Sequence, residues 1–260
     1  MMPRLLYFCC VLVLPLGAQL PPCPGSAATS ELSEGMTASK KAEFAKAVEH
    51  YEAAVQLAPD CTNARLLLGT GYMALYVPGG ETPENLRYAD RAREQFDRIL
   101  SQEPQNDTVM NYIAQIYFNQ KQLDDAKVWY EKVIAVNDES KEAFYGLGVI
   151  AWTRCYPPHM AARTKLGMKP EDSGPLPDPE VRQSLRTRNL PMVEEGIDRL
   201  NRALELDPEY DDAMAYMNLL YREKADIENS DGEYKTDIAR ADEWVRRALE
   251  TKQAKARHRR

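Results

Sequence analysis

The sequence has few of the side chains on which catalysis depends. Among its 260 residues are only three histidines, His50, His159 and His258, and five cysteines. A catalytic site needs converging acids, bases, nucleophiles or a metal ion. The chain has no Gly-x-x-x-x-Gly-Lys phosphate loop, no Gly-x-Ser-x-Gly turn and no Cys-x-x-Cys-His haem-attachment motif. Cys155 and His159 have the spacing of half a zinc site, but no second pair of ligands follows them. We therefore expect no enzymatic activity, no metal and no other cofactor.

Long hydrophobic runs are also missing, except for one at the start of the chain. Leu5–Leu16 is apolar but too short for a membrane-spanning helix, which needs about 20 residues. Arg4 precedes this run, and Leu16-Gly17-Ala18 offers small residues before a cut, as in a secretory signal peptide. We predict that residues 1–18 are a removable signal, with a second possible cut after Ser26-Ala27-Ala28. The prediction is an exported protein, periplasmic or associated with the cell envelope, with no integral span after signal removal. A retained anchor is the alternative.

A basic surface is absent as well. Lys and Arg number 33 against 40 Asp and Glu, a net charge of −7. Removal of residues 1–18 takes away one Arg and leaves 32 basic against 40 acidic residues, or −8. Such a chain repels nucleic acid, and no basic stripe interleaved with aromatic residues occurs in it, so we expect no nucleic-acid partner. Only the tail, residues 251–260, is basic. We expect it to be a solvated, frayed helix end, with a phosphate or membrane-surface contact as the alternative.

Cysteine is scarce beyond the predicted signal, where only Cys23, Cys61 and Cys155 remain. Cys23 follows Leu20-Pro21-Pro22, which lacks the small residues that precede a lipoprotein cysteine. An odd number of cysteines at wide spacing does not indicate a disulfide framework. We expect the cysteines to serve as small buried apolar side chains.

The sequence does contain a recurring pattern of small, aromatic and proline residues. In its first copy, Ala47 and Ala54 lie on either side of Tyr51, and Pro59 follows. The later copies are Ala92, Phe96, Ile99 and Pro104; Ala126, Tyr130, Val133 and Asp138; Gly196, Leu200, Ala203 and Pro208; and Ala241, Val245 and Ala248. A small residue lets two antiparallel helices approach closely, an aromatic ring fills the gap to the next pair, and proline ends a helix. This recurrence indicates an array of helical repeats.

The pattern resembles the tetratricopeptide repeat, whose period is 34 residues. In a frame of that length, Gly35 falls at position 8 and Ala47 at position 20 of the first repeat, and Leu68-Gly69 and Tyr72 follow in the second. The resemblance covers about 28–250. It implies an all-α fold, a right-handed α-solenoid of about five helix-turn-helix repeats. The repeats are 28–61, 62–106, 107–140, 141–210 and 211–250. Cys61 and Cys155 belong to different, non-adjacent repeats, which argues against a disulfide between them.

Three insertions separate the two helices of a repeat, in repeats 2, 4 and 5. They are 76–86, 156–191 and 226–236. A solenoid tolerates loops at this turn because they leave the stacking interfaces untouched. In the first insertion, Thr82 followed by Pro83 and Glu84 predicts the start of a helix. In the second we expect two short helices, His159–Leu166 closed by Gly167, and Pro179–Arg188 capped by Asp178. We expect residues 19–27, rich in Pro, Gly and Ser, to be a disordered lead-in.

The resemblance also implies where a partner binds. In the family, the stacked first helices line a concave groove that holds an extended or helical peptide, through positions 2, 5, 9, 12 and 13 of each repeat. In this chain the residues that we assign to that groove are Leu66, Thr70, Met73, Asn111, Gln115, Phe118, Asn119, Tyr145, Val149, Trp152, Leu219 and Arg222. Lysine is missing from positions 5 and 9 of every repeat, so a clamp for a C-terminal carboxylate is not implied.

Two groups within this set carry the binding hypothesis. Asn111, Gln115 and Asn119 are spaced four apart, so their amides align on one helix face and can bind a peptide backbone. Tyr145 and Trp152 would add flat apolar area of the kind enriched at binding hot spots. The alternatives are that the amides face open water, or that the two aromatic residues pack against the insertion.

We therefore predict a non-enzymatic protein–protein interaction module or scaffold of the cell envelope, which binds a protein or peptide partner in the groove. One alternative is an accessory specificity subunit in envelope assembly, of the cytochrome-maturation or outer-membrane type. Another is an enzyme of unrecognised type with its site in 156–191. That alternative requires His159, Cys155 and nearby acids to be buried and to converge.

Overall fold

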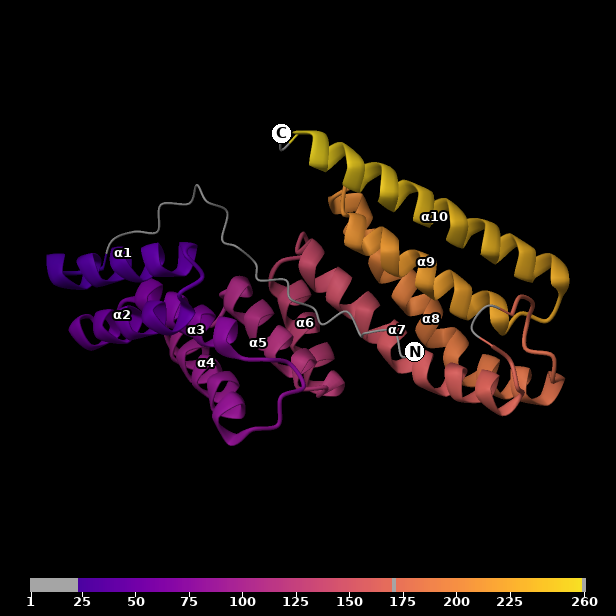
Figure 1. Ribbon diagram of the computed structural model, residues 1–260, viewed down its shortest axis with the longest axis horizontal. Coiled ribbons are helices and arrows are strands. Elements are labelled where there is room, and N and C mark those ends of the chain that lie inside the picture. Colours follow the sequence, from indigo (N-terminus) through magenta and orange to yellow (C-terminus); the bar gives the residue numbers. More distant parts are fainter. Residues whose placement is uncertain (1–22, 170–171, 259–260) are drawn as a thin grey trace. The chain divides into compact units, whose positions relative to one another are not determined.

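The computed structural model describes residues 23–169 and 172–258, which form ten α-helices and no strand (Figure 1). The predicted signal, 1–18, and residues 19–22 lie outside the described residues. The helices are α1 (Ser26–Lys40), α2 (Phe44–Leu57), α3 (Thr62–Leu75), α4 (Pro83–Gln102), α5 (Asp107–Asn119), α6 (Leu123–Val136), α7 (Lys141–Lys165), α8 (Pro179–Leu206), α9 (Asp211–Asp226) and α10 (Asp231–His258). In the two described ranges, no helix has the length and apolar character to span a bilayer. The predicted all-α class is confirmed.

The chain divides into two compact units, Met1–Val136 and Asn137–Arg260. In the first, α1 pairs with α2, α3 with α4 and α5 with α6, and consecutive pairs meet where α2 packs on α3 and α4 on α5. In the second, α7 pairs with α8 and α9 with α10, and α9 packs on both α7 and α8. Each unit is thus a stack of helix pairs.

Glycines at the helix crossings let the helices of a pair approach closely. A Cβ atom on Gly69 of α3 would lie 2.5 Å from the Phe96 ring of α4, closer than two carbon atoms can approach. A Cβ atom on Gly35 of α1 would lie 2.5 Å from the Tyr51 ring of α2. A Cβ atom on Gly71 of the next pair would lie 3.3 Å from the nearest atom of the same ring. The aromatic ring of a second helix therefore fills the space to its own first helix and to the following pair, as the repeat pattern predicts.

The predicted start of α4 is confirmed. Thr82 Oγ1 accepts a hydrogen bond from Asn85 N, and Pro83 is the first helical residue, where its missing N–H costs nothing. The buried Asn85 side chain accepts from Val77 N at 2.7 Å and donates to the Gly80 carbonyl at 2.9 Å. This side chain fixes the loop that precedes the helix.

The prediction of two short helices in 156–191 is wrong. α7 continues without a break through Pro157 and Pro158, and α8 runs from Pro179 through Pro191. The insertion therefore lengthens both helices of the fourth pair. The three prolines lie on exposed or half-buried positions, whereas Cys155 and His159 continue the buried row of α7 at a spacing of four. Pairing of α7 with α8 outweighs the hydrogen bonds that proline removes.

The outer ends of the two lengthened helices agree with the prediction. Gly167 follows α7 with a φ of 72°, a left-handed conformation that glycine adopts readily. Asp178 caps α8, with Oδ1 accepting from Glu180 N at 2.9 Å and Val181 N at 3.0 Å. In the loop between them, Leu176 is fully buried against Leu185 and Ile227. These apolar side chains form a small separate core at the far end of unit 2.

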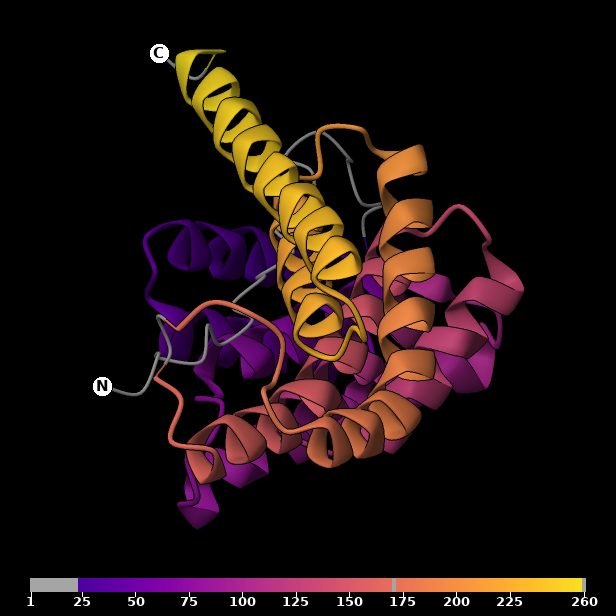
Figure 2. The same ribbon diagram turned by 90° about the vertical axis from the view of Figure 1, so that its right-hand side faces the viewer.

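The third insertion and the basic tail are also mostly helical. Only residues 227–230 lie between α9 and α10, which run side by side (Figures 1 and 2). The frayed tail predicted for 251–260 is therefore wrong for its described part, because α10 continues to His258. Thr251 Oγ1 lies 3.7 Å from Met214 Sδ, and Lys255 Nζ lies 2.6 Å from Asp211 Oδ1. Contacts with the start of α9 hold the end of the last helix in place.

Cys23 and Cys61 form a disulfide with their Cα atoms 5.6 Å apart, contrary to the expectation of free buried cysteines. Cys155 is free and buried, as predicted. The disordered lead-in predicted for 19–27 is wrong for its described residues, since Cys23 is buried and α1 begins at Ser26. The antiparallel pairing of α1 and α2 returns the chain to its start, where the turn before α3 carries Cys61. Sequence spacing alone gives no sign of this proximity.

Candidate functional site

The predicted groove residues of α3 differ in their exposure. Leu66 is 8% exposed and belongs to the core, so it cannot contact a partner. Thr70 and Met73 are half-buried. Thr70 Oγ1 donates to the Leu67 carbonyl at 3.0 Å, and Met73 packs against the core of unit 1. Only Thr70 and Met73 retain surface that a partner could cover.

The amide row of α5 is interrupted in the middle. Asn111 and Asn119 are half-buried, as is Phe118, but Gln115 is only 6% exposed. The expectation that all three amides face a partner is wrong for Gln115, because its side chain is buried in the packing of α5 against its neighbouring helices. The two outer amides remain accessible, one near each end of the helix.

Unit 2 holds a row of aromatic side chains on its first helices. We call it the aromatic row. It consists of Tyr145, Trp152 and Tyr156 of α7, Tyr210 directly before α9, and Tyr216 of α9. The Tyr145 ring lies 4.9 Å from Tyr210 and 5.7 Å from Tyr216, measured between centroids. The Trp152 ring lies 5.6 Å from Tyr216 and 4.9 Å from Tyr156. Edge-to-face and tilted contacts of this kind fix each ring against its neighbours.

The outer part of the row is accessible. Tyr145 is only 2% exposed and so is Val149, which removes both from the predicted binding set. Trp152, Tyr156, Tyr210 and Tyr216 are half-buried. The alternative that both aromatic residues pack against the insertion holds for Trp152, whose ring lies 4.9 Å from that of Tyr156 in 156–191. The Tyr145 ring instead contacts Tyr210 and Tyr216.

Tyr216 of the row stays uncharged over the physiological range. Burial, and then the nearby Asp212 carboxylate, raise the pKa of Tyr216 to about 12. Burial and the charge of Asp211 also raise the pKa of Asp212 above its usual value. The other predicted residues of α9 lie near this surface: Leu219 is half-buried, and exposed Arg222 lies 2.6 Å from Asp242 of α10.

Sequence reasoning missed Tyr156, Tyr210 and Tyr216. Tyr210 caps the start of α9 and Tyr216 lies one position after a groove position, so the family pattern assigns neither to the groove. Tyr210 and Tyr216 lie near Trp152 because α9 packs against α7, and the sequence pattern does not contain this contact. A search for aromatic residues on adjacent first helices, without fixed positions, would have found them.

A group of charged side chains lies toward the C-terminal end of α7, beginning one turn after Tyr156 of the aromatic row. We call it the charge cluster, and it takes buried or half-buried charged residues from every element of unit 2: His159, Arg163, Arg186, Glu223, Lys224, Asp226, Glu228 and Asp237. His159 Nε2 lies 2.9 Å from Asp226 Oδ2, and its Nδ1 lies 2.6 Å from Glu223 Oε2. Burial alone would lower the pKa of His159, but Asp226 and Glu223 outweigh it and raise that pKa to about 9. When His159 is charged, the cluster contains as many positive as negative side chains, so its net charge is zero.

The charge cluster joins segments of the chain. Arg163 pairs with Asp226 and also donates to the carbonyls of Lys169 and Asp172, both at 2.8 Å. Arg186 pairs with Glu228 in the turn before α10. The cluster thus ties the loop after α7 and the start of α8 to the turn between α9 and α10.

This convergence of His159 with acids is the condition set for the enzyme alternative, but the arrangement suits a structural role. Both ring nitrogens of His159 are occupied by carboxylates. Burial and the charge of Glu223 raise the pKa of the Cys155 thiol to about 12, so the thiolate needed for nucleophilic attack is absent near neutral pH. Among the described residues, no group of His, Cys, Asp and Glu has metal-binding geometry.

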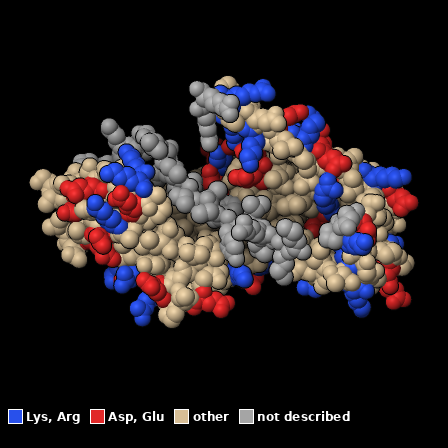
Figure 3. All heavy atoms as spheres, in the orientation of Figure 1, with Lys and Arg blue, Asp and Glu red and all other residues tan. Residues whose placement is uncertain are grey.

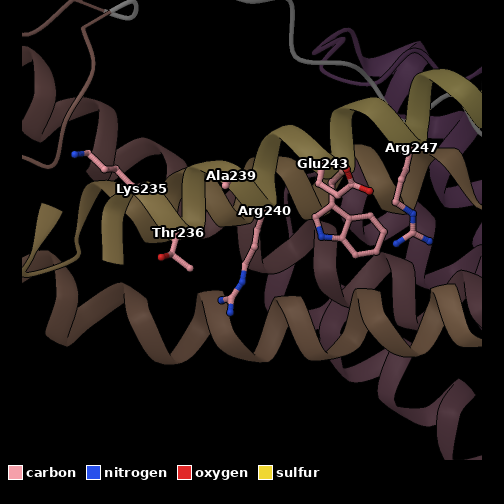
Figure 4. Close-up of a pocket in the computed structure, with 7 residues that line it drawn as sticks. Lys235, Thr236, Ala239, Arg240, Glu243 and Arg247 are labelled. Carbon is pink, nitrogen blue, oxygen red and sulfur yellow. The ribbon is translucent and has the colours of Figure 1, made fainter. Parts of the chain in front are cut away.

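A surface hollow of about 640 Å³ lies along α10 (Figure 4). All seven residues that line it come from that one helix, and the labelled side chains follow one another along it. Three of its charged groups have partners on the same helix: Arg240 pairs with Asp237 and Glu243 with Arg246, and Arg247 lies over the Trp244 ring, 4.2 Å from its centroid. A hollow whose lining residues all come from one helix is an ordinary outer helix face.

On the face of the molecule shown in Figure 3, Lys and Arg lie among Asp and Glu. Ion pairs such as Lys127–Glu131 and Arg202–Glu205 also bring charges of opposite sign together. The mixed charges on the face shown form no stripe suited to a phosphate backbone.

Stacked helix pairs that display aromatic and amide side chains on their first helices define the class of helical repeat scaffolds. Sequence profiles of the tetratricopeptide repeat match residues 32–61 and 89–147. The chain contains tetratricopeptide repeats within an all-α fold of stacked helix pairs, an architecture that supports a protein-interaction scaffold.

Solved structures of low sequence identity share this fold. A crystal structure of MamA matches with 16% identity and a TM-score of 0.53, over 86% of this chain and 96% of that one. A double mutant of MamA RS-1 matches with 17% identity and a TM-score of 0.55, over 89% and 97%. YrrB, described as a TPR protein with an unusual peptide-binding site, matches with 14% identity and a TM-score of 0.51, over 87% and 92%. No curated protein matches the sequence.

Proposed function

We propose that this protein is an exported scaffold of the cell envelope that binds a segment of a partner protein on the aromatic row of unit 2. The observation that carries the proposal is the exposure of Trp152, Tyr156, Tyr210 and Tyr216. These four rings are held by ring–ring contacts yet remain only half-buried. Aromatic side chains that are already ordered lose little conformational entropy on binding, which is one reason for their enrichment at hot spots.

The chemistry of the row favours a partner segment with apolar side chains. The Tyr216 phenol stays neutral near pH 7 and the Trp152 indole carries no charge, and the cation Arg222 of α9 is already paired with Asp242. Asn111 and Asn119 of α5 supply a second, polar surface in unit 1, where amides can donate to and accept from a peptide backbone. YrrB supports the class of ligand, because it has a similar fold and is described as binding a peptide.

The proposed location rests on the disulfide as well as on the predicted signal. Disulfides such as Cys23–Cys61 form and persist mainly in oxidising compartments, including the bacterial periplasm and the cell exterior. A cytosolic protein would hold the same two thiols reduced. The disulfide therefore supports export.

Affinity capture from envelope extracts, with the mature chain as bait, tests the function. We expect wild type to retain a specific partner and Trp152→Ala to retain at most about a tenth as much of it. Truncation of an aromatic hot-spot residue costs about 2 kcal/mol or more, which is roughly 30-fold in affinity. Trp244→Ala is the matched control, since Trp244 is also half-buried in unit 2 but lies on α10. Equal retention by all three baits would exclude the aromatic row as the binding surface.

The polar surface of unit 1 is tested separately with Asn111→Ala/Asn119→Ala. Weaker capture by this variant, with Gln253→Ala on the exposed face of α10 as control, would assign α5 to the interface. Unchanged capture would confine the interface to unit 2.

A further inference from the structure

The disulfide discriminates between the two cuts that the sequence allows for the predicted signal. A cut after Ala18 leaves Cys23 in the mature chain, whereas a cut after Ala28 removes it. Cys23 is 5% exposed and bonded to Cys61. Without Cys23, the chain would keep Cys61 as an unpaired thiol at the turn before α3.

The residues around Ala28 are part of the folded structure. Ala28 lies in the first turn of α1 and is 1% exposed. Thr29 Oγ1 donates to the Cys23 carbonyl at 3.2 Å and to the Gly25 carbonyl at 3.1 Å. A cut after Ala28 would remove buried side chains of the core of unit 1 together with the partners of Thr29. The fold therefore requires a mature chain that begins before Cys23.

We propose that the precursor is hydrolysed between Ala18 and Gln19, and that the mature chain then closes the Cys23–Cys61 disulfide after export. Water adds across the amide bond between Ala18 and Gln19, which gives a new carboxylate and a new amine. The two thiols then pass two electrons and two protons to a disulfide-bearing oxidant, which leaves as a dithiol. This inference rests on the export in the proposed function and adds the processing site and the oxidative step.

The same geometry excludes a lipid anchor on Cys23. A lipoprotein carries its lipid on the sulfur of its first residue, and the Cys23 sulfur is already bonded to Cys61. Leu20-Pro21-Pro22 before it also lacks the small residues of a lipoprotein box. The mature protein is thus released without a lipid on that cysteine.

The test is expression of the full precursor in a secretion-competent bacterium, followed by N-terminal sequencing and intact mass measurement. We expect a chain that starts at Gln19. Alkylation in denaturant should modify one cysteine, Cys155, without reductant and three cysteines with it. A chain that starts at Thr29, a lipid on Cys23, or three reactive thiols without reductant would overturn the proposal.

Two precursor variants make the assignment independent of folding. Ala18→Glu places a charged side chain where the predicted cut needs a small one, so unprocessed precursor should accumulate. Ser26→Glu changes the first small residue of the Ser26-Ala27-Ala28 box, at an exposed position, and processing should be unchanged. The opposite pair of results would place the cut after Ala28. An uncut wild-type precursor with every cysteine reduced would instead refute export itself, and with it this part of the proposed function.

Discussion

His159 lies between the carboxylates of Glu223 and Asp226, and this placement keeps its imidazole charged in the folded protein. Its pKa is raised from 6.5 to about 9, because the two acids outweigh the effect of burial. A folded-state pKa above the unfolded value means that the charged group stabilises the fold fully below pH 6.5. That stabilisation is lost as the pH rises through about 9.

We predict that the stability of unit 2 decreases over this pH range. The shift corresponds to about 3 kcal/mol in the free energy of unfolding. Urea unfolding at a series of pH values should show the decrease in wild type and little of it in His159→Gln. His258→Gln, at an exposed position, should behave as wild type. The same slope in His159→Gln as in wild type would contradict the account.

Gly69 illustrates a residue whose identity is fixed by packing. The Phe96 ring fills the space beside Gly69, since an added Cβ atom would lie only 2.5 Å from that ring. Gly69→Ala should therefore destabilise unit 1 by about 1–3 kcal/mol through overpacking, although alanine favours helix by about 1 kcal/mol. Gly232→Ala is the control, because its added Cβ would meet nothing closer than 4.0 Å. This control should be slightly stabilising in thermal unfolding, and equal effects of the two substitutions would refute the packing argument.

At the scale of the helices, local chemistry predicted where elements begin and end but not how far they continue. Thr82 and Asp178 cap helices because an oxygen at that position satisfies free backbone N–H groups, which needs no tertiary information. The continuation of α7 through Pro157 depends on pairing with α8, and a local pattern does not contain it. Proline therefore suggested a loop where long-range packing forms a helix.

The binding surface was predictable only in part, for a related reason. The family pattern assigns positions to the first helices, but the neighbouring helix decides which of them stay accessible. Trp152 and Asn111 remain half-buried, whereas Gln115 and Tyr145 are covered. The disulfide partner of Cys23 depends on the return of the chain through α1 and α2, so spacing could not identify it either.

The disulfide should contribute to the stability of the first helix pair. Its closure of a 38-residue segment restricts the unfolded chain, which corresponds to about 4 kcal/mol. Reduction should lower the urea midpoint of wild type, and Cys23→Ser/Cys61→Ser should have the lower midpoint with or without reductant. Cys155→Ala should keep the dependence on reductant. A wild-type midpoint that does not change on reduction would exclude this contribution.

At the scale of the whole molecule, the chain combines an acidic balance with a mixed surface and two stacks of helix pairs. A net charge of −7 supports solubility and opposes nucleic-acid binding, and it names no partner. The lengthened helices of unit 2 add the charge cluster at one end of α7, while Tyr145 and Trp152 lie nearer its start. The charge cluster and the proposed binding surface thus occupy different stretches of the same helix.

The most direct test of the binding surface is the fluorescence of Trp152 alone. The chain has three tryptophans, so Trp129→Phe/Trp244→Phe leaves Trp152 as the only one. Addition of the captured partner should shift its emission to shorter wavelength, because the partner would cover a ring that is half-exposed in the free protein. An unchanged emission from Trp152, together with a shift in the chain that retains only Trp244, would contradict the account.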